Sequence, residues 1–253
     1  MPNQGAQSDR SPTSVGVFAT THWSVVLNAG QDDSSQALLA IEKLARSYWY
    51  PLYAYVRRKG YDSHTAEDLT QEFFARVVNR DSFARVDRSK GRFRSWLLGA
   101  MNHFLAHEWE KARTQKRGGG AVMVPLDEAQ ANERYQRHLA VECAPEKLFD
   151  QQWAITILER AGTRLRAGYV ADGRPEFYDC LKAFVSGEVA APSYEEAALQ
   201  LGLSESAVKS AIHRLRQHFQ ELVREEVAQT VCTPGDLDDE LRYLLAVIRS
   251  CPP

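Results

Sequence analysis

The sequence predicts an all-α protein with two helical domains joined by a flexible linker. Along most of the chain, apolar residues recur three or four positions apart, as in an amphipathic helix, and no stretch alternates as a β-strand does. The run GGG at 118–120 opens a polar stretch that divides this helical pattern in two. We therefore expect a disordered tail at 1–20, a helical domain at 21–117, the linker at 118–144, a second helical domain at 145–230 and a C-terminal extension at 231–253.

The first domain is expected to hold several helices that pack through aromatic residues. An aromatic-rich stretch predicts a packed helix that begins at or near Pro51, and Gly60 marks its end. Asp62 or Ser63 then caps a helix that turns its apolar side chains inward and its acidic side chains outward. A polar, basic connector leads to residues 93–117, where a strong apolar stripe is flanked by cations.

The second domain begins near Pro145 and leads into a helix-turn-helix pattern at Ser193–Val223. Ser193 offers a side-chain acceptor at a helix start, and Gly202 supplies the left-handed residue that ends this short helix. Ser204 caps a second helix, whose apolar residues step by four, three, four and three. One face of that helix is therefore expected to be buried.

The second helix of this pattern carries polar and basic side chains opposite its buried face. In a helix-turn-helix such a helix enters the major groove, which brings these side chains to bases and phosphates. An ordinary helical hairpin with a solvated charged face is the alternative that spacing alone leaves open. We expect Ser206, Lys209, Ser210 and His213 near base edges, and Arg214 and Arg216 near phosphates.

The composition is that of a globular protein with an uneven distribution of charge. The net charge is −2, yet residues 85–117 hold nine Lys and Arg against three Asp and Glu. The N-terminus lacks the apolar core of a signal peptide and no apolar run reaches membrane-spanning length, which predicts a cytoplasmic protein. The four cysteines are widely spaced, so we expect reduced thiols and no zinc site.

Three stretches in order resemble the extracytoplasmic-function (ECF) class of bacterial RNA polymerase sigma factors. The polymerase-binding helix of that family is similar to AEDLTQEFFARVV at 66–78, and its promoter-melting helix to FRSWLLGAMNHFLAHEWEKARTQKR at 93–117. Its promoter-reading motif is similar to SYEEAALQLGLSESAVKSAIHRLR at 193–216. The resemblance implies a non-enzymatic subunit without a cofactor, which directs core RNA polymerase to promoters and helps to melt them.

The resemblance also implies roles for individual residues. Acidic residues of the first helix would contact the coiled-coil clamp of the largest polymerase subunit, and the second helix would bind the melted promoter element. There an aromatic ring stacks on an unpaired base for ~1–3 kcal/mol, although the aromatic residues also fit a buried stripe. The implied polymerase contacts are Asp68, Gln71 and Glu72, and the implied melted-promoter contacts are Arg92, Phe93, Arg94, Trp96, Asn102, Trp109, Lys111 and Arg113.

Two other functions fit part of the sequence. His103 and His107 are four residues apart on a helix, a spacing that can bind one metal ion, but no third ligand follows and the pattern is not HExxH. The other is a helix-turn-helix transcriptional regulator that acts without binding polymerase. It does not explain why an acidic helix at 66–78 and an aromatic, cationic helix at 93–117 occur together. Core RNA polymerase and promoter DNA are therefore the expected partners, and an anti-sigma or other regulatory protein is left open.

Two shorter helices are expected outside the domains. Ala129–Leu139 is a candidate within the linker, and Asp236–Arg249 forms a short amphipathic helix with an acidic start. Packing on its own domain is the ordinary role for such a C-terminal helix. A second hypothesis is that its acidic residues cover the basic recognition surface or dock a regulator.

Overall fold

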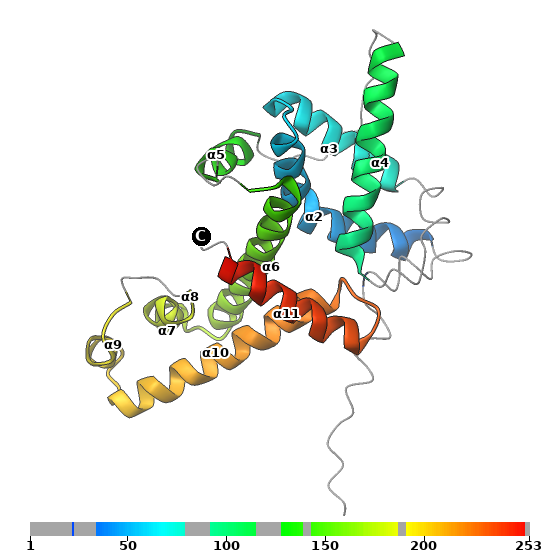
Figure 1. The fold of residues 1–253 in the computed structure, drawn as a ribbon. Helices are drawn as coiled ribbons and strands as arrows, with labels where there is room; N and C mark the ends of the chain where they lie inside the picture. The colour runs from blue at the N-terminus through cyan, green and yellow to red at the C-terminus, as the bar shows by residue number, and fades with distance from the viewer. Residues whose placement is uncertain are drawn as a thin grey trace, which may run out of the picture.

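The structure, a computed structural model, describes residues 22, 34–78, 92–114, 128–138, 143–186 and 191–250. These residues are helical and contain no β-strand (Figure 1), which confirms the all-α prediction. The predicted tail at 1–20 and the connector at 79–91 lie outside them. None of the described helices combines the length and apolar character that crossing a membrane requires. The helices are α2 (Ser34–Arg58), α3 (Ser63–Val78), α4 (Phe93–Thr114), α5 (Glu128–His138), α6 (Pro145–Ala171), α7 (Pro175–Leu181), α8 (Ala183–Ser186), α9 (Tyr194–Leu201), α10 (Glu205–Ala228) and α11 (Pro234–Ser250).

The long helix α2 runs through Pro51, so the expectation that a helix begins near this proline is wrong. A proline inside a helix removes one backbone hydrogen bond and crowds the preceding turn. The neighbouring side chains of Tyr48, Leu52 and Tyr53 are all fully buried. Burial of this aromatic face offsets the local penalty, because packing supplies most of the stability of a helix within a protein.

Helix α6 lies at the centre of the molecule, packed along α2 and contacted by α10 and α11 (Figure 1). Phe149 of α6 stacks on Tyr48 of α2, with 6.4 Å between ring centroids. Phe93, the first residue of α4, meets Tyr48 edge to face at 4.9 Å. One aromatic core therefore joins helices from both predicted domains, a contact that the sequence did not predict.

The described part of the linker is helix α5, close to the candidate range of Ala129–Leu139. Tyr135 is buried, and the Arg57 guanidinium of α2 donates a hydrogen bond of 2.8 Å to the Asn132 side chain. Arg134 lies over the ring of Tyr50 at 4.2 Å from its centroid. These contacts attach α5 to the N-terminal helices. The domain boundaries themselves stay a prediction.

Candidate nucleic-acid interface

The helix-turn-helix forms as its local signals predict. Ser193 caps α9 through a reciprocal capping box with Glu196, and Gly202 ends the helix in the left-handed region at φ +64°. The Ser204 side chain then accepts a hydrogen bond of 3.2 Å from the backbone N–H of Ala207 at the start of α10. Each signal acts over three or four residues, which is why the sequence alone predicts this turn.

One side of α10 is buried and the opposite side faces solvent. Val208, Ile212 and Leu215 lie in the core. Figure 1 shows α9 and the start of α10 at the end of the molecule away from α4. The surface offered there combines hydroxyl, imidazole and cationic groups, the side-chain types that bind base edges and phosphates. All six residues expected at DNA are exposed: Ser206, Lys209, Ser210, His213, Arg214 and Arg216.

Two of these cations already have contacts within the protein. The Lys209 ammonium lies 3.6 Å from the Glu205 carboxylate and 5.3 Å from the centre of the Tyr194 ring. Arg216 donates a hydrogen bond of 3.0 Å from Nε to the backbone carbonyl of Phe184. An exposed ion pair of this kind contributes little, about 0–1 kcal/mol, so Lys209 can exchange Glu205 for a phosphate at small cost.

The acidic helix α3 presents two of its three expected contact residues outward. Asp68 is exposed and pairs with His64 at 3.1 Å. Glu72 is half-buried and receives a hydrogen bond of 2.5 Å from Arg76. Gln71 is buried, and its amide donates to Glu67 at 2.9 Å. The outward surface of α3 is therefore carboxylate-bearing, with Gln71 behind it.

The second carboxylate partner of Arg76 ties α3 to α4. Arg76 donates a hydrogen bond of 2.7 Å to Glu108 of α4, and its guanidinium lies 4.9 Å from the centre of the Phe104 ring. Burial alone would raise the pKa of Glu108, but the hydrogen bond and charge of Arg76 hold that pKa below its usual value. This contact fixes the acidic helix relative to the cationic one.

The aromatic residues of α4 lie in three different environments. Phe93 is only 3% exposed and belongs to the core. Trp96 is partly buried, with its ring 5.7 Å from that of Phe93. Trp109 is 57% exposed, far along the helix. Trp109 is therefore accessible for stacking on a base, whereas Phe93 occupies the buried position that its place on the apolar stripe also allowed.

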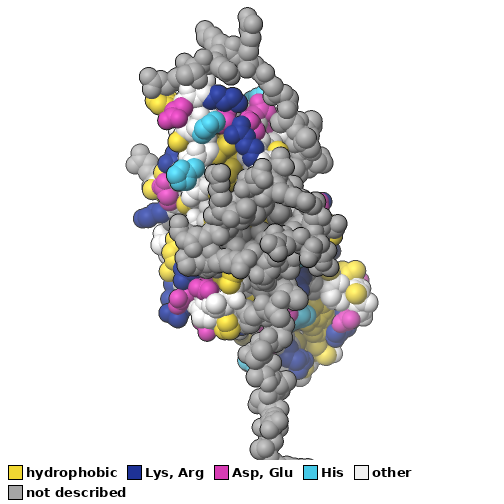
Figure 2. All heavy atoms as spheres, turned by 90° about the vertical axis from the view of Figure 1, so that its right-hand side faces the viewer, with side chains coloured by type: hydrophobic (Ala, Val, Ile, Leu, Met, Phe, Trp, Pro, Cys, Tyr) yellow, Lys and Arg dark blue, Asp and Glu magenta, His cyan; other side chains and the backbone are white. Residues whose placement is uncertain are grey.

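The remaining α4 positions divide between surface and internal contacts. Asn102 is exposed, yet its side-chain oxygen accepts a hydrogen bond of 2.5 Å from the Tyr55 hydroxyl. Lys111 is exposed and lies 3.7 Å from Glu108. Arg113 belongs to the last turn of α4, and its side chain lies outside the part described. Figure 2 shows cationic, histidine and acidic side chains mixed on the upper part of the visible face, where α4 projects.

Arg92 and Arg94 are held by carboxylates. Arg94 is 7% exposed and binds Glu240 of α11 through Nε at 2.8 Å and Nη2 at 3.3 Å, while Nη1 donates to Asp150 of α6. Burial alone would lower the pKa of Arg94, but these two carboxylates raise it above its usual value. Arg92 pairs with Asp239 at 3.3 Å and with Glu240 at 3.5 Å. Both arginines are therefore engaged inside the protein.

The acidic start of α11 does not cover the recognition surface, so that part of the hypothesis is wrong, whereas docking of a regulator stays a prediction. Asp239 and Glu240 bind the start of α4, and Asp238 pairs with Arg224 in the second half of α10 at 3.0 Å. His103 and His107 are both exposed. Within the described residues, no group of three or more His, Cys, Asp or Glu side chains is placed to hold a metal ion.

Comparison with known protein families gives matches to two segments of the chain, one that includes α3 and α4 and one that includes α9 and the start of α10. The family model for sigma-70 region 2 covers residues 44–115, and the model for sigma-70, region 4 covers residues 192–219. The ECF RNA polymerase sigma factor SigE of Mycolicibacterium smegmatis is 27% identical over 220 residues, which span 87% of this chain and 71% of that protein. Both sigma-70 regions and this relative support the assignment of the chain to the ECF class of sigma factors. No solved structure matches at a significant level.

This sigma factor thus has region 2 on α2, α3 and α4, and region 4 on α9 and α10. Sigma factors direct RNA polymerase to promoters for the initiation of transcription, and the matches to both regions support this function for the chain. The α11 helix lies beyond both matched segments.

Sequence reasoning missed the residues that hold the start of α4, among them Asp150 and Tyr243. The Tyr243 hydroxyl donates a hydrogen bond of 2.5 Å to Asp150, and burial together with this bond raises the pKa of Tyr243 to about 12. One local signal was available for Arg94. It stands three residues before Leu97 and seven before Met101, both fully buried, so it shares their face of the helix.

Proposed function

We propose that this sigma factor divides promoter recognition between its two ends. The exposed surface of α10 reads the upstream element in duplex form, α4 binds and helps to open the downstream element, and α3 binds core polymerase. The observation that carries the proposal is the exposure of all six candidate side chains on one surface of α10, opposite its buried stripe. A helix so arranged can enter the major groove without disturbing its own core.

For the polymerase contact, the exposed carboxylate of Asp68 and the half-buried one of Glu72 are the groups available on α3. A basic surface on the partner would attract them and speed association. Gln71 is buried between them, so we assign it to positioning the helix rather than to contact.

For the melted strand, Trp109 is the exposed aromatic ring on α4, with Lys111 two residues further along. Stacking on Trp109 and charge neutralisation by Lys111 are the contacts open to single-stranded DNA in this conformation. Since its partners would be polymerase and promoter DNA, we expect the protein in the cytoplasm. An anti-sigma protein that binds the same surfaces would compete with both partners.

Run-off transcription by core RNA polymerase on a pool of promoters tests the proposal. We expect promoter-specific transcripts that disappear in the variant Asp68→Arg/Glu72→Arg, because the reversed charges repel a basic partner surface. Asp172→Arg is the matched control, since this exposed carboxylate lies after α6 and outside both matched segments. Circular dichroism must show that the variants fold, because Glu72 also binds Arg76.

Two results would overturn parts of the proposal. Continued transcription by the reversed variant would show that α3 is not the polymerase contact. A chain that binds DNA, yet neither starts transcripts nor co-purifies with polymerase, would be a transcriptional regulator that acts without polymerase.

A further inference from the structure

The C-terminal helix α11 lies beyond both matched segments, yet it contacts helices from both halves of the chain. It packs on α6 and α10 (Figure 1), and its Leu237 and Leu244 are buried. Its Glu240 is fully buried and faces the start of α4 rather than solvent. The helix thus joins the start of α4, in region 2, to the second half of α10, although it belongs to neither matched segment.

The first residues of α4 are held by backbone contacts as well as by charge. The Phe93 N–H donates a hydrogen bond of 3.1 Å to the carbonyl of Thr230, and Arg92 forms an isolated antiparallel bridge with Val231. Thr230 and Val231 belong to the turn that joins α10 to α11. Between them, the turn and α11 therefore hold Arg92, Phe93 and Arg94.

The carboxylates of this site occupy the positions that phosphates would need. The Nε and Nη2 atoms of Arg94 donate to Glu240, and its Nη1 donates to Asp150. All three guanidinium nitrogens are therefore engaged by carboxylates and are not available to a phosphate. The Arg94 Cζ also lies 4.3 Å from the centre of the Tyr243 ring, which covers it from α11. Phe93 is 3% exposed and Arg94 is 7% exposed, so nucleic acid can reach these two side chains only after the helices that cover them, α11 among them, move.

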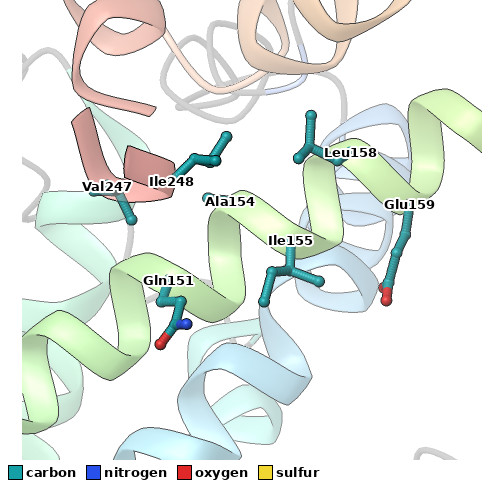
Figure 3. A pocket seen from close by; sticks show the side chains of 7 residues that line it. All are labelled: Gln151, Ala154, Ile155, Leu158, Glu159, Val247 and Ile248. Carbon is teal, nitrogen blue, oxygen red and sulfur yellow. The ribbon is translucent and has the colours of Figure 1, made fainter. Parts of the chain in front are cut away.

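The contact of α11 with α6 is incompletely filled at its far end. Val247 and Ile248 of α11 face Ile155 and Leu158 of α6 across an apolar groove of about 180 Å³ (Figure 3). An unfilled apolar contact stabilises less than a close-packed one. Helix α11 is therefore held most firmly at its start, by the charged site, and less firmly at its end.

We propose that residues 230–250 are an intramolecular latch, which closes on the start of α4 and withholds Arg92, Phe93 and Arg94 from promoter DNA until it opens. Polymerase or DNA that binds the open form better shifts the population toward it. The proposal rests on the role of α4 proposed above, so its first test measures opening without DNA or polymerase.

Hydrogen exchange of the full chain, followed by mass spectrometry, compares Glu240→Gln with Asp238→Asn. Losing one charge-assisted hydrogen bond corresponds to a roughly ten- to hundredfold shift in the opening equilibrium. We expect exchange at the start of α4 and in α11 to accelerate by that factor in Glu240→Gln. Asp238→Asn removes an exposed pair between α11 and α10 and should leave the start of α4 protected. Equal protection in the two variants would overturn the latch.

A reversible cross-link tests whether opening controls function. Antiparallel bridge partners have Cα atoms within the range that a disulfide spans, so Arg92→Cys/Val231→Cys can lock the latch, with Cys232→Ser avoiding a wrong pairing. We expect the oxidised chain to lose most promoter-dependent transcription and the reduced chain to regain it. Comparing the two forms of one variant cancels any direct effect of losing Arg92. Wild-type transcription by both forms would overturn the latch. If neither form transcribes, Arg92 is needed for initiation, and the hydrogen-exchange comparison decides the proposal.

Discussion

Replacing Arg94 with methionine should destabilise this protein more than replacing either carboxylate that binds it. The substitution leaves Asp150 and Glu240, both buried, facing each other without the cation between them. Arg92, at 3.5 Å from Glu240, is the remaining nearby cation with a described contact to this carboxylate. Two buried like charges repel in a medium that screens them weakly.

The expected magnitudes follow from burial. Removing one partner of a buried ion pair costs about 3–5 kcal/mol, so Arg94→Met belongs at this level. Glu240→Gln keeps an acceptor for Arg94 and leaves Asp150 to balance its charge, so we expect about 1–3 kcal/mol. Arg92 is more exposed, and Arg92→Met should cost less than about 1 kcal/mol.

Urea unfolding followed by circular dichroism measures these differences. With an m-value of about 3 kcal/mol/M, the Arg94→Met midpoint should fall by roughly 1 M or more. Unchanged m-values are the control, because a changed slope signals a different unfolding transition. The reasoning fails if Arg94→Met is no less stable than Glu240→Gln, since the carboxylates would then not depend on this cation.

Three further outcomes are expected. Gly202→Ala should destabilise by about 1–2 kcal/mol, because φ is +64° there, whereas Gly162→Ala inside α6 should stabilise; urea midpoints that moved in the same direction would contradict this. Arg76 lowers the pKa of Glu108 in the folded protein, so this pair contributes stability above the usual glutamate pKa and loses it as the pH falls through the folded-state pKa. Below about pH 4.5, the melting temperature of Glu108→Gln should therefore fall less steeply with pH than that of the unsubstituted protein. Lys209→Ala should weaken duplex binding and reduce the salt slope by about one phosphate contact, and an unchanged slope would remove Lys209 from the interface.

The sequence was sufficient to predict those parts of the structure that depend on residues close together along the chain. The caps of α9 and α10 and the left-handed Gly202 act within three or four residues, so the turn and the starts of both helices were predicted, although α10 runs on to Ala228, beyond the predicted end at Val223. The order of an acidic helix, a cationic aromatic helix and this motif also indicated the family. The exposed surface of α10 followed from the spacing of its buried stripe.

The tertiary structure decided which expected contact residues are accessible. Trp109 and Phe93 lie on the same helix with similar patterns, yet Phe93 is buried because α2 and the turn before α11 pack on the start of α4, whereas Trp109 lies near the other end and is exposed. Pro51 likewise stays within α2 because distant side chains bury the turns around it. Arg94 is the clearest case: its partner Glu240 is 146 residues away. No local pattern encodes such a pair, because the sequence around Arg94 is compatible with binding either a DNA phosphate or a buried carboxylate. The packing of α11 decides between them by placing Glu240 beside Arg94.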